Sequence, residues 1–148
     1  MNKKGFTLVE LLAVIALVAI LSGIAVTNVV SSINNSKKNA FLLDAKRMVS
    51  KAEYLISSKK TDREQALSSR KIYTFSELNE KGEFLKDADD GSFDNSSFVM
   101  VSKNGSSFNY CICVIGSKRK IGDSCNASSG TGCVSSTSLT GIDNVTDK

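Results

Sequence analysis

The hydrophobic pattern changes twice along the chain and divides it into three parts. Residues 11–30 are mostly apolar over about 20 positions, which is the length of a membrane-spanning helix. From residue 41 to residue 56 the apolar positions recur three and four apart, which predicts an amphipathic helix. Beyond residue 58, short apolar runs alternate with polar segments rich in glycine, serine and asparagine, which predicts strands and turns.

The first two parts predict one long helix, from about residue 7 to about residue 58. We expect its second half to bury an apolar stripe and to expose a charged face. The stripe consists of Phe41, Leu42, Ala45, Met48, Val49, Ala52, Leu55 and Ile56. Residues 31–36 are mainly serine and asparagine, whose side chains compete for backbone hydrogen bonds, so the helix should be weakest there.

The third part predicts a small antiparallel sheet. Its clearest sign is a hairpin, because the strand-like runs 97–102 and 107–115 flank Asn104-Gly105, a pair that favours tight hairpin turns. We also expect a strand at 71–75, a helical turn at 76–81 that ends at Gly82, and a last strand at 133–137. Residues 59–70 should finish the long helix or form a loop, and the tail after Gly141 should be mobile.

The fold class that follows is α+β, with the long N-terminal helix packed on an antiparallel sheet of three or four strands. A chain of 148 residues has room for this helix and one modest domain. The formal charge is +4, and it would fall to about +2 without Lys3 and Lys4. A charge this small is no sign of a nucleic-acid-binding protein.

A motif precedes the apolar run. It consists of Lys3, Lys4, Gly5, Phe6, Thr7, Leu8, Val9 and Glu10. This order of a basic leader, glycine, an aromatic residue, threonine, leucine, an apolar residue and glutamate resembles the type III signal of type IV pilins and pseudopilins. The resemblance covers about the first thirty residues and concerns the route of export and assembly.

The resemblance implies a processing step and an assembly contact. A prepilin peptidase would cleave between Gly5 and Phe6 and methylate the new amino terminus. Glu10 would then neutralise the Phe6 ammonium group of a neighbouring subunit, with Thr7 beside it. Such a partner accounts for a lone carboxylate in an apolar helix, which costs roughly 2.5–3.5 kcal/mol at the centre of a bilayer.

The resemblance also implies an organisation and a location. Residues 1–5 would be the leader, residues 6–30 the transmembrane and filament-core helix, and residues 31–148 an extracytoplasmic, ladle-shaped pilin domain that includes the amphipathic half of the helix. The subunit would sit in the cytoplasmic membrane with this domain outside and then join a cell-surface filament. The implied partners are other pilins in a homo- or hetero-polymer, the peptidase, the assembly platform and the membrane.

Two other interpretations explain parts of the same region. Thr7 and Glu10 have the spacing of a capping box, which would suit any helix start but leaves Gly5 and Phe6 unexplained. Gly23 and Ala25 offer small residues for a conventional signal peptidase. The apolar run is longer than the core of a cleaved signal, so a retained helix is favoured.

Four cysteines, Cys111, Cys113, Cys125 and Cys133, lie in the part expected outside the cell, which favours disulfides. Cys111 and Cys113 would point to the same side of a strand and pair poorly with each other. Each should therefore bond to a downstream cysteine, in a nested or a crossed pattern. A zinc site is disfavoured because the two-residue spacing of zinc knuckles is absent.

Two charged segments are candidate binding loops. One is acidic and consists of Asp87, Asp89, Asp90 and Asp94 around Gly91. Some secretion pseudopilins bind calcium in an equivalent region, but the spacing does not fit an EF-hand, so we favour a solvated acidic turn and expect no metal. The other is basic and consists of Lys118, Arg119 and Lys120. In a DNA-uptake pilus these residues could contact DNA phosphates, but three charges support DNA as a partner only weakly, and a solvated loop explains the run at least as well.

Candidate catalytic groups are scarce. The chain has no histidine, so Ser-His and Cys-His pairs are excluded, and no glycine-rich phosphate loop or nucleophile elbow occurs. The sequence therefore predicts a non-enzymatic protein without a cofactor: a structural subunit of a type IV pilus or of a secretion or competence pseudopilus. The alternative is a single-pass membrane anchor that displays a disulfide-bonded adhesive or binding module without polymerising.

Overall fold

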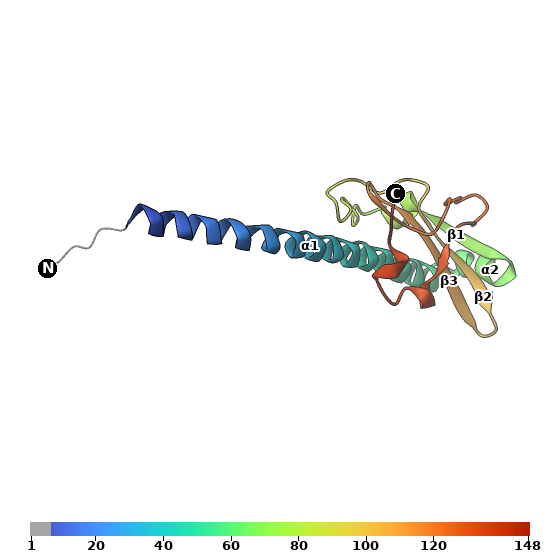
Figure 1. The fold of residues 1–148 in the computed structure, drawn as a ribbon. Coiled ribbons are helices and arrows are strands. Elements are labelled where there is room, and N and C mark those ends of the chain that lie inside the picture. Colours follow the sequence, from blue (N-terminus) through green and yellow to red (C-terminus); the bar gives the residue numbers. More distant parts are fainter. Residues whose placement is uncertain (1–6) are drawn as a thin grey trace. The chain divides into compact units, whose positions relative to one another are not determined.

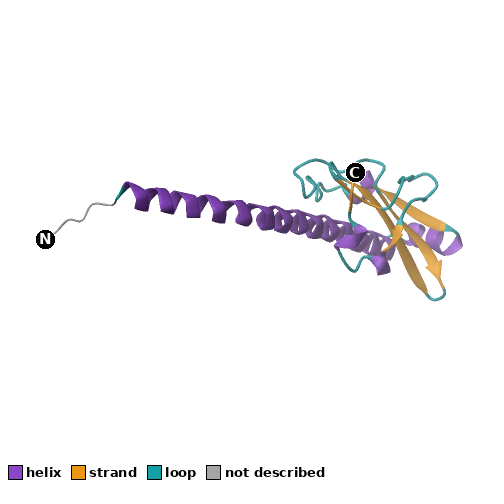
Figure 2. Cartoon of the chain, in the orientation of Figure 1, coloured by secondary structure: helices purple, strands orange, loops and turns teal. Residues whose placement is uncertain are grey.

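The computed structural model describes residues 7–148, together with the side chains of that range except residues 24–27 (Figure 1). The chain divides into two compact units, Met1–Ser36 and Lys37–Lys148. Helix α1, Leu8–Ser58, contributes to both units and has the extent that the sequence predicts. Helices, strands and loops are distinguished in Figure 2. Residues 31–36 are helical and exposed.

The amphipathic half of α1 forms one side of the hydrophobic core. All eight residues of the predicted stripe are buried, and the exposed fractions of Phe41, Ala45 and Ala52 are 0 %. Lys46 and Glu53 lie on the exposed face. Apolar residues spaced three and four positions apart lie along one side of a helix, so this spacing in the sequence identifies the buried face of α1.

A second helix, α2, spans Lys60–Ser68. The expectation that residues 59–70 continue the long helix or form a loop was therefore wrong. Lys59 has extended backbone angles, φ −107° and ψ 108°, which end α1 and allow the chain to restart in another direction. Ala66 is fully buried, whereas Leu67 is exposed, so Ala66 is the residue by which the short helix joins the core. Asp62 of this helix also accepts a hydrogen bond from the Tyr73 hydroxyl at 3.0 Å.

Six strands form one antiparallel sheet within residues 7–148, where the sequence predicted three or four. The strands are β1 Arg70–Thr74, β2 Phe98–Asn104, β3 Ser107–Ile115, β4 Arg119–Ile121, β5 Val134–Ser135 and β6 Thr146–Asp147. The order is β1-β2-β3-β4-β6, and β5 pairs with β3. The α+β class is confirmed, and the additional strands are β4 and β6, which are too short to show a periodic pattern.

One face of the sheet meets α1. In the β1–β2–β3 register, Tyr73 pairs with Val99, and Val99 pairs with Ile112. These three side chains are buried in the same core as Phe41 and Met48. Alternate residues of the strands face the opposite side, because successive side chains of a strand point to opposite faces. The cysteines of β3 share that opposite side with Met100.

The hairpin between β2 and β3 turns one residue later than the sequence predicts. Asn104 is the last residue of β2 and pairs with Ser107, so Gly105 and Ser106 occupy the turn. Gly105 has φ +61°, whereas Ser106 is not among the residues with positive φ. A positive φ at the first central position only is the pattern of a type II′ turn, which requires glycine there.

Between β1 and β2 lies a short helix, α3 Phe75–Leu78. It starts with a capping box, in which Thr74 and Glu77 satisfy each other's backbone amides. It is shorter than the expected turn at 76–81, and Gly82 follows it with φ +67°. Phe75 and Leu78 are buried, so this turn closes one end of the core.

The tail beyond Gly141 is ordered, and the prediction of a mobile tail was wrong. Two 3-10 turns, η1 Ser136–Ser138 and η2 Ile142–Asn144, lead into β6, which pairs with β4. Val145 is 1 % exposed and belongs to the core. The tail is held by the buried Val145, by the two residues of β6, and by the Lys148 amide, which donates to the Lys118 carbonyl at 2.9 Å. None of these contacts has a recognisable pattern in the sequence.

Candidate assembly site

Thr7 and Glu10 form a reciprocal cap at the start of α1. The amide and the hydroxyl of Thr7 both donate to Oε2 of Glu10 at 2.9 Å, and the Glu10 amide donates to Oγ1 of Thr7 at 3.3 Å. This is the capping box that the spacing allows. An ionised carboxylate accepts about four hydrogen bonds, so capping leaves acceptor positions on Glu10 for a further donor.

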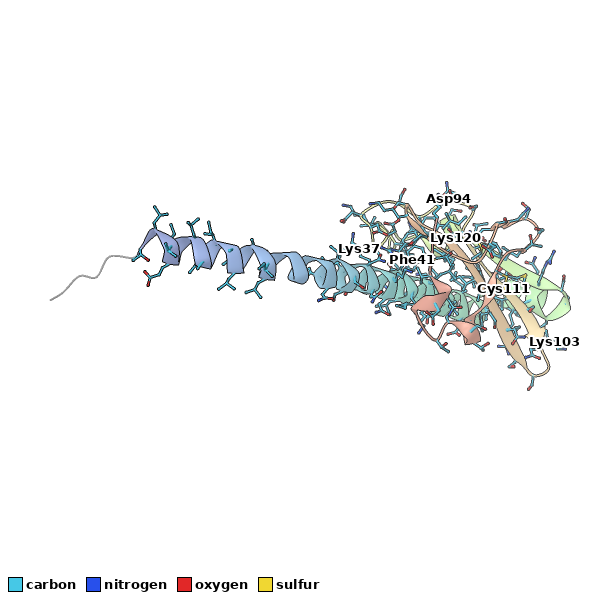
Figure 3. The ribbon with its side chains drawn as sticks, viewed as in Figure 1. Lys37, Phe41, Asp94, Lys103, Cys111 and Lys120 are labelled. Carbon is cyan, nitrogen blue, oxygen red and sulfur yellow. A yellow bond between two sulfur atoms is a disulfide. The ribbon has the colours of Figure 1, made fainter. Side chains whose placement is uncertain are left out.

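The predicted processing residues, Gly5 and Phe6, lie outside the described residues. Beyond the cap, the described large apolar side chains from Leu8 to Ile33 are all between 50 % and 76 % exposed. Figure 3 shows them extending from α1 on all sides. An exposed apolar surface of this extent requires lipid or other protein to cover it.

The first part of α1 satisfies the requirements for a membrane span. Within residues 7–148, α1 is the one helix that is long and apolar enough to cross a membrane, judged by length and composition alone. Its most apolar window of 18 residues has a mean hydropathy of 2.7, and none of that window is buried.

The acidic loop is folded rather than solvated. Asp87 is 6 % exposed and accepts hydrogen bonds from the amides of Asp89 and Gly91, each at 2.9 Å, and from the amide of Ser117. Burial alone would raise the pKa of Asp87, but these donors outweigh it and hold the pKa below its usual range. The prediction of a solvated acidic turn was therefore wrong for this residue.

Asp89 and Arg119 form a buried ion pair, which also corrects the expectation of a solvated basic loop. Nε of Arg119 donates to Oδ2 of Asp89 at 2.7 Å, and Nζ of Lys37 lies 3.2 Å from Oδ1. Arg119 and Lys120 belong to β4 rather than to a loop, and Lys120 pairs with Asp123 at 3.0 Å. These contacts engage two of the three basic residues, and Lys118 is exposed.

The remaining acidic residues do not converge on a common point. Asp94 accepts from the amide and hydroxyl of Ser96, and the exposed carboxylate of Asp90 lies 3.8 Å from Lys86. Within residues 7–148, no group of three or more histidine, cysteine, aspartate or glutamate side chains is placed to hold a metal ion. The acidic residues instead cap turns and pair with cations.

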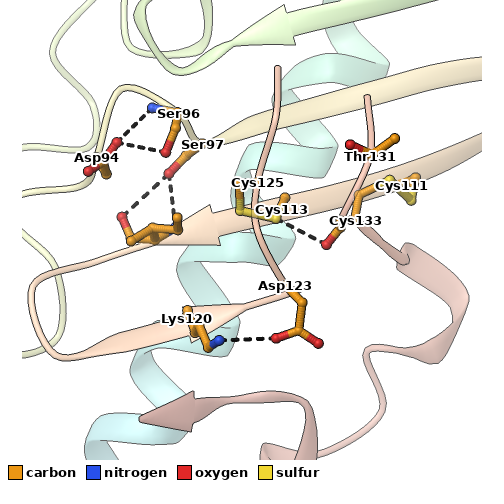
Figure 4. Close-up of a disulfide and its surroundings, with 12 residues drawn as sticks. Asp94, Ser96, Ser97, Cys111, Cys113, Lys120, Asp123, Cys125, Thr131 and Cys133 are labelled. Carbon is orange, nitrogen blue, oxygen red and sulfur yellow. Dashed lines mark hydrogen bonds and ion pairs between the residues drawn. A yellow bond between two sulfur atoms is a disulfide. The ribbon is translucent and has the colours of Figure 1, made fainter. Parts of the chain in front are cut away.

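The four cysteines form two disulfides, Cys111–Cys133 and Cys113–Cys125 (Figure 4). This is the nested pattern of the two that the sequence left open. The Cα atoms are 5.5 Å and 5.6 Å apart, within the usual range for a disulfide. Both bonds attach residues 125–133 to β3, on the face of the sheet opposite α1.

One hollow has two glutamates among its lining residues. It has a volume of about 300 Å³, and Glu77, Glu80, Tyr73 and Lys59 line it. A general acid would need a raised pKa. Burial would raise the pKa of Glu77, but hydrogen bonds from Thr74 and Lys71 outweigh it and lower the pKa. The direction of this shift at Glu77 is opposite to the one that a general acid requires.

Comparison with known proteins identifies the N-terminal segment. Residues 1–26 match the family model described as the prokaryotic N-terminal methylation motif, which is the prepilin signal of type IV pilins and pseudopilins. No curated protein and no solved structure matches the chain. The match confirms the resemblance seen between Lys3 and Glu10 and ends well before the folded unit Lys37–Lys148.

Proposed function

We propose that this chain, which carries a prepilin signal, is a structural subunit of a type IV pilus or of a related secretion or competence pseudopilus. The observation that carries the proposal is the methylation motif at residues 1–26, which includes the start of α1 with its exposed apolar side chains. A filament of such helices would cover this surface, and the membrane would cover it before assembly. The role is structural rather than enzymatic.

Processing would prepare the site for assembly. Cleavage after Gly5 would remove residues 1–5 and create a cationic terminus at Phe6, which is then methylated. Residues 6–30 would be the membrane and filament-core helix, and residues 31–148 the domain outside the cytoplasmic membrane. Two disulfides in that domain support an oxidising compartment outside the cytoplasm.

Charge pairing would then select the neighbouring subunit. Apolar helices gain little from leaving lipid for one another, because lipid chains are as apolar as leucine. An ammonium group from Phe6 of the next copy, meeting the carboxylate of Glu10, would supply a specific attraction in a medium of low dielectric constant. The Thr7–Glu10 cap supports this role by holding the carboxylate at the start of α1.

The first experiment determines the mature amino terminus by mass spectrometry of protein purified from cells that contain a prepilin peptidase. The proposal expects a chain that starts with N-methylated Phe6. Retention of Met1, or cleavage near Ala25, would contradict it.

The second experiment separates the charge of Glu10 from its capping role. Glu10→Gln retains a capping acceptor and loses the charge, whereas Thr7→Ala removes the capping hydroxyl and retains the charge. We expect Glu10→Gln to enter the membrane and to abolish filaments in an assembly assay, and Thr7→Ala to assemble at a reduced level. Equal assembly of Glu10→Gln and the wild type would show that the charge has no part in it.

The alternative, an anchored binding module that does not polymerise, has one observation in its favour. Lys37–Lys148 forms a compact unit with its own core and two disulfides, and so resembles a displayed domain. Crosslinking between cysteines introduced at exposed helix positions, for example Val14→Cys, distinguishes the two. Ladders of crosslinked species support a polymer, and monomers alone support the anchored module.

A further inference from the structure

Strand β1 has an open edge with unpaired main-chain groups. It ends the sheet order, and within residues 7–148 it pairs only with β2 (Figure 1). The Phe75 amide donates to the carbonyl of Ser97, the residue opposite it, so Phe75 and Ser97 form a hydrogen-bonded pair. Hydrogen-bonded and non-hydrogen-bonded pairs alternate along antiparallel strands, so this pair determines which residues of β1 bond to β2. Lys71 and Tyr73 therefore bond to β2. Arg70 and Ile72 direct their N–H and C=O groups to the open edge.

A groove of about 490 Å³ runs beside this edge, within the range of roughly 300–1,000 Å³ that ligand sites occupy. Ser69, Arg70, Ile72 and Thr74 form its strand side, and Gln65 of α2 is also among its lining residues. Ser128 adds a further hydroxyl from the loop between the disulfides. Arg70 and Ile72, whose main-chain groups face the open edge, are thus among the residues that line the groove. The Thr74 amide is already bonded to Oε2 of Glu77.

The loop side of the groove is pre-formed. Oδ1 of Asn126 accepts from the amides of Ser128 and Ser129, at 3.0 and 3.1 Å. Gly130 packs so closely that a Cβ there would lie 2.6 Å from Sδ of Met100. Disulfides fix both ends of residues 125–133. A ligand would therefore lose little entropy in ordering this wall.

The charge of the groove indicates an acidic ligand. Arg70 and Lys71 are the charged side chains that line it, and no carboxylate does. Lys71 is already paired with Glu77 at 3.1 Å, whereas Arg70 is exposed. We propose that the β1 edge binds an extended acidic peptide segment of a partner protein, which joins the sheet as a seventh strand and places a carboxylate against Arg70. The main-chain ladder would supply affinity, and Arg70 would supply selectivity.

The test uses the full-length protein in detergent micelles and fluorescence anisotropy. The probe is a labelled six-residue peptide of alternating valine and aspartate. One comparison peptide replaces aspartate with lysine. Another is N-methylated at every amide, so that it keeps its charge and cannot donate hydrogen bonds to the carbonyl groups of Arg70 and Ile72. The lysine peptide should bind more than fivefold more weakly than the acidic peptide, because it loses the ion pair with Arg70 and meets a like charge there. Binding of the methylated peptide should be about tenfold weaker, because two hydrogen bonds are lost.

Variants of the protein give matched controls. Arg70→Gln should weaken binding of the acidic peptide about fivefold, the effect of an exposed ion pair. Lys103→Gln, an exposed cation that does not line the groove, should leave it unchanged. Circular dichroism checks that both variants fold. Undetectable binding of the acidic peptide, equal binding of the methylated peptide, or binding of a polyuronate oligosaccharide that the peptide does not displace would overturn the proposal.

Discussion

Asp89 joins α1 to β4 through one carboxylate, with Arg119 Nε at 2.7 Å from Oδ2 and Lys37 Nζ at 3.2 Å from Oδ1. The side chains of Arg119 and Asp89 are only 6 % and 3 % exposed. Lys37 is the first residue of the folded unit. The carboxylate therefore fastens the first turn of that unit's helix to the sheet. Loss of its charge would remove the nearer counter-charge of the buried Arg119, whose Nη1 also lies 3.5 Å from Oδ1 of Asp147.

Asp89→Asn should lower the free energy of unfolding by about 3 kcal/mol, because the buried Arg119 would keep its charge and lose the buried carboxylate at 2.7 Å, while the Asp147 carboxylate at 3.5 Å is exposed. Urea denaturation followed by circular dichroism measures the change. Asp90→Asn is the matched control, since its carboxylate is 87 % exposed and asparagine tolerates the φ of +65° at this position. An equal effect of the two substitutions would contradict the role given to Asp89.

Stability should fall in acid because of Asp87 and Asp89. Burial would raise the pKa of Asp89, but Arg119 and Lys37 outweigh it and hold the pKa below the ordinary value of 3.8. The folded protein then binds fewer protons than the unfolded chain, so the stabilisation is complete well above pH 3.8 and is lost as the pH falls through the lower folded-state pKa values. The urea concentration at the midpoint of unfolding, measured across this pH range, reports the loss of stability. In the Asp89→Asn variant this midpoint should fall less steeply as the pH is lowered. An unchanged slope in that variant would assign the acid sensitivity to other carboxylates.

Gly116→Ala should destabilise the domain by about 1–3 kcal/mol through overpacking. A Cβ at Gly116 would lie 2.6 Å from the ring of Phe41 and 2.7 Å from Oδ2 of Asp87, and neither group is free to move. Gly141→Ala is the control, because nothing lies within 4 Å of a Cβ there. Thermal unfolding should separate the two variants, and similar melting temperatures would show that the core adapts around residue 116.

Substitution of one bonded pair of cysteines should remove one disulfide and leave the other intact. Replacing Cys111 and Cys133 by alanine leaves Cys113–Cys125 intact, so a thiol reagent should find no free cysteine in the folded variant. Each missing bond should cost about 3 kcal/mol, slightly more for the pair 22 residues apart than for the pair 12 residues apart. Two reactive thiols in the variant would indicate the crossed pairing.

The parts of the fold that the sequence could predict are those with a repeated pattern. The stripe from Phe41 to Ile56 identifies the core face of α1, because several residues at helical spacing must share one side. The hairpin could be predicted from two strand-like runs around Asn104-Gly105. The turn itself lies at Gly105-Ser106, where only Gly105 has positive φ, as in a type II′ turn. The leader motif is likewise a series of adjacent residues.

The parts that could not be predicted depend on single contacts between distant segments. Asp89 and Arg119 are 30 residues apart, and each looks like a solvated charge until the fold brings them together. The open edge of β1 and its groove arise from strand order and from the position of a disulfide-bonded loop, neither of which has a local pattern. Strand β4 has three residues and β6 two, so neither shows alternation.

Val145→Ala tests whether the C-terminal segment belongs to the folded unit. Val145 is 1 % exposed and packs in the core, and β6 directly after it pairs with β4. Removing two buried methyl groups should cost about 2 kcal/mol from lost apolar burial and the cavity that remains. Hydrogen exchange should also show earlier opening of β6 and β4. The control is Thr146→Ala at an exposed position, which should change stability by less than about 0.5 kcal/mol. Equal, small effects of both substitutions would show that this tail does not contribute to the core in solution.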